Sequence, residues 1–151
     1  MAKRLEVGAL RRLGNAVVKR AILLGVAGRS DFVLLTRGRS TGREHATPVR
    51  TIVEGGRWLV SPYGVTDWVR NVRASGEARL RRRGHDVVYR AAEAEPAEGA
   101  PILRRYAREV PVVRSYLEPS HDDPAEAWER EVATHPVFRL EPLREAAHLP
   151  H

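Results

Sequence analysis

The sequence has 151 residues, of which 42% are hydrophobic and 30% are charged, a composition typical of one ordinary globular domain. It contains no cysteine, which excludes disulfides, thiolate metal sites and cysteine nucleophiles. The net charge of +7 is unevenly distributed. Residues 1–90 carry 19 Lys and Arg against 7 Asp and Glu, whereas residues 91–151 carry 7 against 12. We therefore expect one part of the protein to attract anions.

The N-terminal segment has the periodicity of an amphipathic helix over residues 5–26, and we assign residues 1–28 to it. Such a helix fits three partners: the rest of the domain, an anionic membrane surface, or a second copy of the chain in a homodimer. Its lysines and arginines interrupt any signal-peptide core, and no apolar run approaches the roughly 18 residues of a membrane span. We expect a cytoplasmic protein.

The chain from residue 29 to residue 142 has the pattern of a mainly β domain, followed by a tail over residues 143–151. We predict strands at 31–37, 47–53, 57–61, 77–83, 86–94 and 137–140, and helices at 68–74, 96–117 and 124–134. Asp67 is the predicted N-cap of the first helix, Gly76 ends it, and Pro111 divides the second. Short hairpin connections predict an antiparallel sheet, and about six such strands can close into a small barrel with helices outside. The predicted fold class is therefore α+β, mainly β.

The loop over residues 38–43 follows the abrupt end of an apolar strand and holds two glycines, two hydroxyl side chains and two arginines. Because glycine tolerates a positive φ, successive backbone N–H groups can turn inward there as an anion nest. Ser40 and Thr41 add short donors, and Arg39 and Arg43 add fixed charge with bidentate reach. The loop predicts a phosphate site, with a basic surface hairpin as the alternative.

Residues 61–71 form the second candidate segment. A strand end, a loop with proline and glycine, and a helix start place backbone N–H groups where a charged or planar ligand can sit. Trp68 and Asn71 lie one helical turn apart and share a face. Trp68 is a ligand contact in this interpretation and a core anchor in the alternative.

The densest basic run, residues 79–83, predicts a solvated strand face. Nucleic-acid binding is the less favoured alternative, because no aromatic residues interleave with the arginines for base stacking. The serines have no hydrolase motif around them, and no two of the six histidines have helical ligand spacing inside a predicted element. We therefore expect no metal site.

Three segments together resemble the deazaflavin-dependent nitroreductase family, which uses coenzyme F-420. Residues 34–48 (LLTRGRSTGREHATP) are similar to that family's signature LLTTxGRKSGxxRxTPL. Residues 68–74 (WVRNVRA) are similar to its WxxNLRANP helix, and residues 137–142 (VFRLEP) to its closing IPVxxLEP strand. The resemblance covers residues 30–142 and implies a split β-barrel like that of the FMN-binding proteins of the flavin-reductase type.

The resemblance also implies that a groove holds the deazaflavin ring, while the basic loop holds its phosphate and acidic oligoglutamate tail. The residues expected to bind the cofactor are Arg39, Ser40, Thr41, Gly42, Arg43, His45, Ala46, Thr47, Pro48, Ser61, Pro62, Tyr63, Gly64, Val65, Trp68 and Asn71. FMN is the second choice of cofactor.

The sequence departs from the family pattern at three places. The loop lysine is Ser40, the following arginine is His45, and the ANP after the helix is ASG at residues 74–76. A protonated His45 can replace part of the lost charge. These departures keep open an alternative of another class, a non-catalytic binding protein of the same fold that holds a flavin, haem or fatty acid.

The family resemblance implies an oxidoreductase that passes hydride from reduced coenzyme F-420 to an electron-poor small molecule such as a quinone, nitroaromatic or enone. The ring carries the chemistry, and the protein supplies binding, orientation and exclusion of water. Tyr63 is the predicted substrate contact or proton donor. Tyr106 and Tyr116 are weaker candidates for a lid over the pocket.

Overall fold

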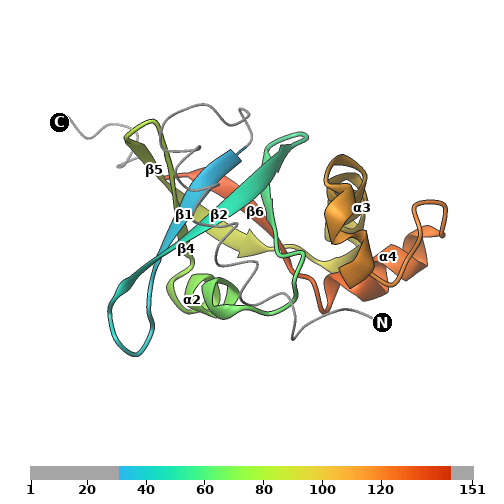
Figure 1. The fold of residues 1–151 in the computed structure, drawn as a ribbon, viewed down its shortest axis with the longest axis horizontal. Coiled ribbons are helices and arrows are strands. Elements are labelled where there is room, and N and C mark those ends of the chain that lie inside the picture. Colours follow the sequence, from blue (N-terminus) through green and yellow to red (C-terminus); the bar gives the residue numbers. More distant parts are fainter. Residues whose placement is uncertain (1–30, 144–151) are drawn as a thin grey trace.

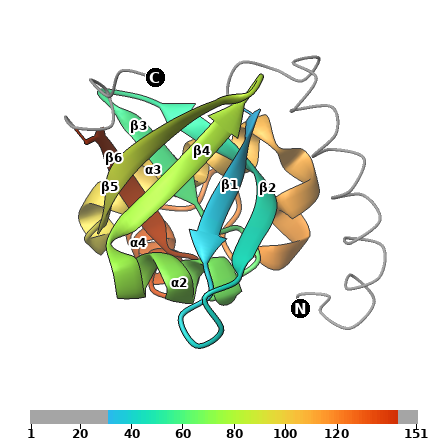
Figure 2. The same cartoon turned by 90° about the vertical axis from the view of Figure 1, so that its left-hand side faces the viewer.

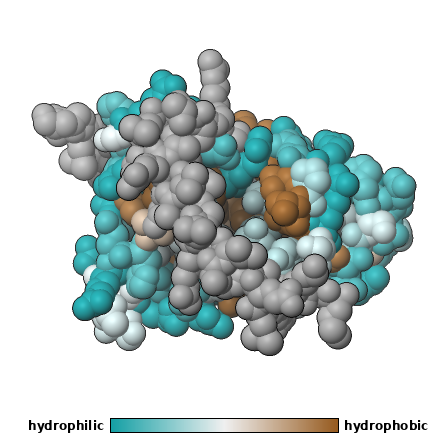
Figure 3. Space-filling view, viewed as in Figure 1, coloured by the Kyte–Doolittle hydropathy of each residue, from teal (hydrophilic) through white to brown (hydrophobic). Residues whose placement is uncertain are grey.

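The computed structural model of the chain describes residues 31–143 (Figure 1). The predicted N-terminal helix and all but the first residue of the predicted tail lie outside the described residues. No helix in this part of the chain is long and apolar enough to cross a membrane. The described surface seen in Figure 3 is largely hydrophilic, and its apolar side chains gather in small patches.

Ten elements follow one another along the described chain. They are β1 (Asp31–Arg37), β2 (Glu44–Val53), β3 (Arg57–Val60), α2 (Asp67–Ser75), β4 (Glu77–Arg82), β5 (His85–Glu93), α3 (Pro96–Glu109), the 3-10 helix η1 (Pro111–Tyr116), α4 (Ala125–Val132) and β6 (Val137–Pro142). The six strands form a closed barrel in the order β1-β2-β3-β6-β5-β4, and every pair is antiparallel. This confirms the predicted fold class.

The barrel and its helices enclose two main apolar clusters. One fills the barrel and includes Leu34, Leu59 and Phe138, over which α2 contributes Trp68 and Val69. The other lies between the barrel wall and helices α3 and α4, which pack together on one side of the barrel (Figures 1 and 2). Burial of these side chains supplies the main driving force for folding.

The structure settles four details of the predicted elements. β2 begins three residues earlier than predicted, because its ladder with β1 continues to the pair Arg37 and Glu44. The prediction of Asp67 as an N-cap is wrong: Thr66 is the extended residue that precedes the helix, and Asp67 occupies its first turn. Gly76 ends α2 with a φ of 72°, as its lack of a Cβ allows. Pro111 separates α3 from η1 as predicted.

The arginine run of β4 is engaged by carboxylates of neighbouring strands. Arg81 makes two hydrogen bonds to Asp86, at 2.6 and 2.9 Å, and this pairing lowers the pKa of Asp86. Arg79 pairs with Glu44. The run therefore stabilises contacts between β2, β4 and β5 and presents an ordinary ion-paired strand surface.

Candidate functional site

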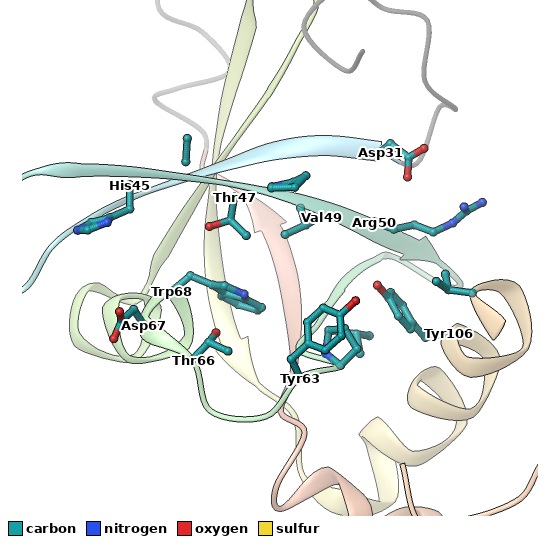
Figure 4. A pocket seen from close by; sticks show the side chains of 15 residues that line it. Asp31, His45, Thr47, Val49, Arg50, Tyr63, Thr66, Asp67, Trp68 and Tyr106 are labelled. Atoms are coloured by element: carbon teal, nitrogen blue, oxygen red, sulfur yellow. The ribbon is translucent and has the colours of Figure 1, made fainter. Parts of the chain in front are cut away.

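A cavity of about 490 Å³ lies between β2 and the segment that joins β3 to α2 (Figure 4). β2 forms one wall through Thr47 and Val49, and Tyr63 and Trp68 form the opposite wall. The lining residues are Asp31, His45, Ala46, Thr47, Pro48, Val49, Arg50, Val60, Pro62, Tyr63, Thr66, Asp67, Trp68, Tyr106 and Val110. The volume suits a drug-sized or cofactor-sized ligand.

The predicted cofactor residues divide into two groups. His45, Ala46, Thr47, Pro48, Pro62, Tyr63 and Trp68 line the cavity. Arg39, Ser40, Thr41, Gly42, Arg43, Ser61, Gly64, Val65 and Asn71 are not among its lining residues. The structure therefore brings the start of β2 and the loop after β3 together. The tip of the basic loop, residues 39–43, lies outside the cavity.

The loop after β3 is held in place by hydrogen bonds of Ser61. This serine is fully buried; its hydroxyl donates to the Gly64 carbonyl at 2.5 Å, and its N–H donates to the Pro136 carbonyl at 2.9 Å. Gly64 has a φ of 97°, a conformation that disfavours any side chain. Ser61 thus fastens the loop that carries Pro62 and Tyr63, and it does not face the ligand space as predicted.

The basic loop is a tight hairpin that uses several of its own donors. The Gly38 N–H donates to the Arg43 carbonyl at 2.7 Å, and the Gly42 N–H donates to the Gly38 carbonyl at 2.9 Å. The Arg43 N–H donates to the Thr41 hydroxyl at 3.2 Å. These three N–H groups are consequently committed to the turn and do not form the anion nest that its glycines predict.

The ring of His45 packs against the backbone of Gly38. A Cβ built at Gly38 would lie 3.0 Å from His45 Nε2 and 2.8 Å from Thr41 Oγ1, so a larger residue would displace one of them. This close approach explains the glycine and directs His45 to one end of the cavity, beside Asp67 (Figure 4).

The basic loop is tied to α2 through Asn71, which is only 2% exposed. Its amide donates to Thr36 Oγ1 at 3.2 Å, and its carbonyl oxygen accepts from Arg39 Nη1 at 2.8 Å. Arg39 also lies 3.9 Å from the carboxylate of Asp67. The arginine therefore sits beside the His45 end of the cavity, with Asn71 as a positioning residue behind it.

Two tyrosines lie together at the other end of the cavity. Tyr63 is 39% exposed and packs edge-to-face on Tyr116 of η1, with ring centroids 4.9 Å apart. Tyr106 of α3 is buried, and burial raises its pKa well above that of free tyrosine. Both hydroxyls point towards β2, near Val49 and Arg50 (Figure 4).

Several features of the cavity fit a deazaflavin. Trp68 and Val49 offer flat apolar walls to a fused ring, and the positive charge of Arg39 lies near one end. The hydroxyl oxygen of Thr66 is buried in the lining and finds no hydrogen-bond partner among the described residues. A ring with polar edges would supply that partner, so the residues fit the cofactor implied by the resemblance.

Seven lining residues were not named by sequence reasoning: Asp31, Val49, Arg50, Val60, Thr66, Asp67 and Val110. Thr66 and Asp67 nevertheless lie within the candidate segment of residues 61–71. For Val49 and Arg50 a signal existed, since they continue the strand that starts at the predicted contacts Thr47 and Pro48. For Asp31 and Val110 no local signal exists, because only the closure of the barrel and the packing of α3 bring them to the cavity.

We predict that Asn71→Ala lowers the free energy of unfolding by about 1–3 kcal/mol, because it leaves two buried or half-buried polar groups without their partner. Urea unfolding with an unchanged m-value would measure this loss. Asn71→Asp keeps an oxygen that accepts from Arg39, so a smaller loss is expected. Wild-type stability in Asn71→Ala would contradict the positioning role.

The part of the chain that the structure describes has no group of three His, Cys, Asp or Glu side chains that could hold a metal. No curated protein sequence matches the chain. Solved structures do match at low identity. The protein Atu2129 from Agrobacterium tumefaciens, of unknown function, is 18% identical with a TM-score of 0.56, covering 84% of this chain and 54% of its own.

Two further structures show the same fold. A chain described as a domain-swapped dimer is 19% identical with a TM-score of 0.55 and covers 90% of this chain and 99% of its own. An F420-H2 dependent reductase, FDR-A, is 20% identical with a TM-score of 0.52 and covers 75% of this chain and 95% of its own. At such identities the likeness establishes the split-barrel fold and not the activity.

The activity follows from a family model described as F420H(2)-dependent quinone reductase, which matches residues 2–136. This match covers the basic loop and the α2 helix, two of the three segments that carry the resemblance, and ends just before the closing strand. It favours an enzyme over a non-catalytic binding protein. The chain therefore belongs to the F420H(2)-dependent quinone reductase family and is a deazaflavin-dependent oxidoreductase with coenzyme F-420 as its cofactor.

Proposed function

We propose that the cavity between β2 and α2 is the active site, and that it reduces a quinone or a similar electron-poor small molecule. The observation that carries this proposal is the position of the cavity. Its aromatic side chains lie close to the basic loop (residues 38–43) and to His45. A planar ring fits between the walls, and an anionic tail fits the cationic end.

Each group of residues has a distinct part in this proposal. Trp68 and Val49 hold the faces of the ring, and Thr66 binds a polar atom at its edge. Arg39, Arg43 and His45 attract the phosphate and the acidic tail. When bound in its reduced form, the deazaflavin supplies the hydride, which with one proton converts a quinone into a hydroquinone. The apolar walls exclude water from the reacting atoms.

Tyr63 is the proposed donor of the proton. Its ring lines the cavity, and its partial exposure allows the phenol to regain a proton from solvent. A hydroxyl that donates to the acceptor's carbonyl oxygen would stabilise the negative charge that develops there as hydride arrives. The ring contact with Tyr116 holds Tyr63 in place.

Association into a homodimer, a membrane contact through residues 5–26 and a cytoplasmic location remain predictions. One structural neighbour is described as a domain-swapped dimer, which supports testing the oligomeric state of this chain.

Parallel fluorescence titrations test the choice of cofactor. Coenzyme F-420 should bind more tightly than FMN, because the cationic loop can engage an acidic tail that FMN lacks. Arg39→Ala and Arg43→Ala should each weaken F-420 binding by about 1–3 kcal/mol and reduce its salt dependence. Arg130→Ala, on the exposed side of α4, is the charge-matched control and should bind as wild type.

Two results would overturn this assignment. One is FMN binding as tight as that of F-420, and the other is wild-type F-420 affinity in both loop variants. Either result would mean that the basic loop is a surface hairpin that does not bind the cofactor.

Tyr63→Phe should lower the rate of quinone reduction and leave F-420 affinity nearly unchanged, because the ring remains and only the hydroxyl is lost. We expect a loss of about 10- to 100-fold in turnover, within the range for a positioned proton donor. Tyr116→Phe keeps the edge-to-face contact and should retain activity. Equal rates for wild type and Tyr63→Phe would remove the tyrosine from the mechanism.

A further inference from the structure

The end of the cavity remote from the basic loop contains an arginine with an unused donor. Arg50 of β2 lines the cavity and lies opposite Asp31 in the β1–β2 register. Its Nε atom is buried and finds no hydrogen-bond partner within residues 31–143. Because a buried N–H group without an acceptor destabilises a protein, an oxygen atom at this position would remove a cost that the folded chain otherwise carries.

The neighbouring carboxylate does not satisfy this donor. Glu109 Oε1 lies 3.8 Å from Arg50 Nε, which is beyond hydrogen-bonding distance. The other oxygen of Glu109 accepts from Arg105 Nε at 2.8 Å. Glu109 is therefore held by Arg105 and leaves the Nε of Arg50 available to a ligand in the cavity.

Carboxylates already offset the positive charge at this end. Glu109 lies beside Arg50, and Arg105 pairs with both Glu54 and Glu109. These two carboxylates balance the two guanidinium groups. An anion therefore gains no net attraction from this cluster, and a neutral oxygen acceptor is favoured over a carboxylate or phosphate.

A second donor lies beside Arg50. The phenol of Tyr106 points towards β2 at the same end of the cavity (Figure 4). Burial raises the pKa of Tyr106, so the phenol keeps its proton throughout the physiological range. The guanidinium and the phenol can thus donate to one oxygen, as in sites that bind a carbonyl group.

These observations separate the two ligands of the proposed reaction along the cavity. The cofactor has an anionic tail, which suits the end near Arg39 and His45 and gains no net attraction from the charge-balanced cluster of Arg50, Arg105, Glu54 and Glu109. A quinone has neutral carbonyl oxygens and no tail. The Arg50 end therefore suits the electron acceptor.

We propose that Arg50 binds a carbonyl oxygen of the electron acceptor and that the carboxylates around it select neutral acceptors over anionic ones. This inference rests on the proposed function. It makes Arg50 a specificity-determining residue of the acceptor site.

Isothermal titration calorimetry with menadione, in the absence and presence of oxidised coenzyme F-420, tests the contact without turnover. Arg50→Gln should weaken menadione binding by about tenfold, the effect of losing one charge-assisted hydrogen bond, and should leave F-420 affinity within about twofold. Arg139→Gln removes the same charge from an exposed strand position paired with Glu98 and Glu141 and should change neither affinity. The sequence has no cysteine, so thiol addition cannot consume the quinone.

Lawsone, a hydroxynaphthoquinone that is anionic at neutral pH, tests the charge selection. It should bind wild type about tenfold less tightly than menadione, and Glu109→Gln should narrow this difference by removing one carboxylate. Lawsone binding as tight as that of menadione would contradict the selection of neutral acceptors.

The remaining outcomes distinguish a failure of the acceptor contact from a failure of the proposed cofactor site. Unchanged menadione affinity in Arg50→Gln, or no menadione binding to wild type under either condition, would overturn the acceptor contact. A loss that falls on F-420 affinity instead would place the cofactor at Arg50 and also overturn it. If wild type binds menadione through Arg50 but does not bind F-420, the proposed cofactor site fails while the acceptor contact stands.

Discussion

The hydrogen bonds of Asn71 are the interaction on which the site depends. They join the end of β1, the basic hairpin and helix α2, three segments that are separate in sequence and together surround one end of the cavity. A buried amide that donates to Thr36 and accepts from Arg39 ties the hairpin to a helix that apolar packing of Trp68 and Val69 already holds on the barrel. Without this link, the direction of Arg39 would depend on one exposed ion pair with Asp67, which contributes little to orientation.

The two ends of the cavity differ in charge, and this difference gives the site a direction. Arg39 and His45 lie at one end beside Asp67, whereas Arg50 lies at the other end beside Glu109, which also pairs with Arg105. In the proposed site, a ligand with an acidic tail therefore places that tail at the Arg39 end, which leaves the tyrosine end for a neutral partner. The fold achieves this because β2 runs along the whole cavity and contributes residues to both ends.

The sequence alone predicts much of the fold and less of the site. β1 has the predicted bounds, and five other strands and the break at Pro111 occur close to where periodicity and turn residues place them. Ser61 and Asn71 were predicted as ligand contacts, yet both are buried and bind other parts of the chain. Helical spacing shows which residues share a face but not what packs against that face. Asp31 and Val110 escaped prediction for a related reason, since only the closure of the barrel and the packing of α3 bring them to the cavity.

The central claim is that the cavity binds reduced coenzyme F-420 and an electron-poor acceptor, and that hydride passes from the coenzyme to the acceptor. The most direct measurement follows the oxidised deazaflavin chromophore as reduced coenzyme is mixed with menadione, with and without the protein. We predict oxidation faster than in the protein-free mixture, saturating in both ligands. Tight F-420 binding without turnover of menadione, a nitroaromatic or an enone would contradict the account.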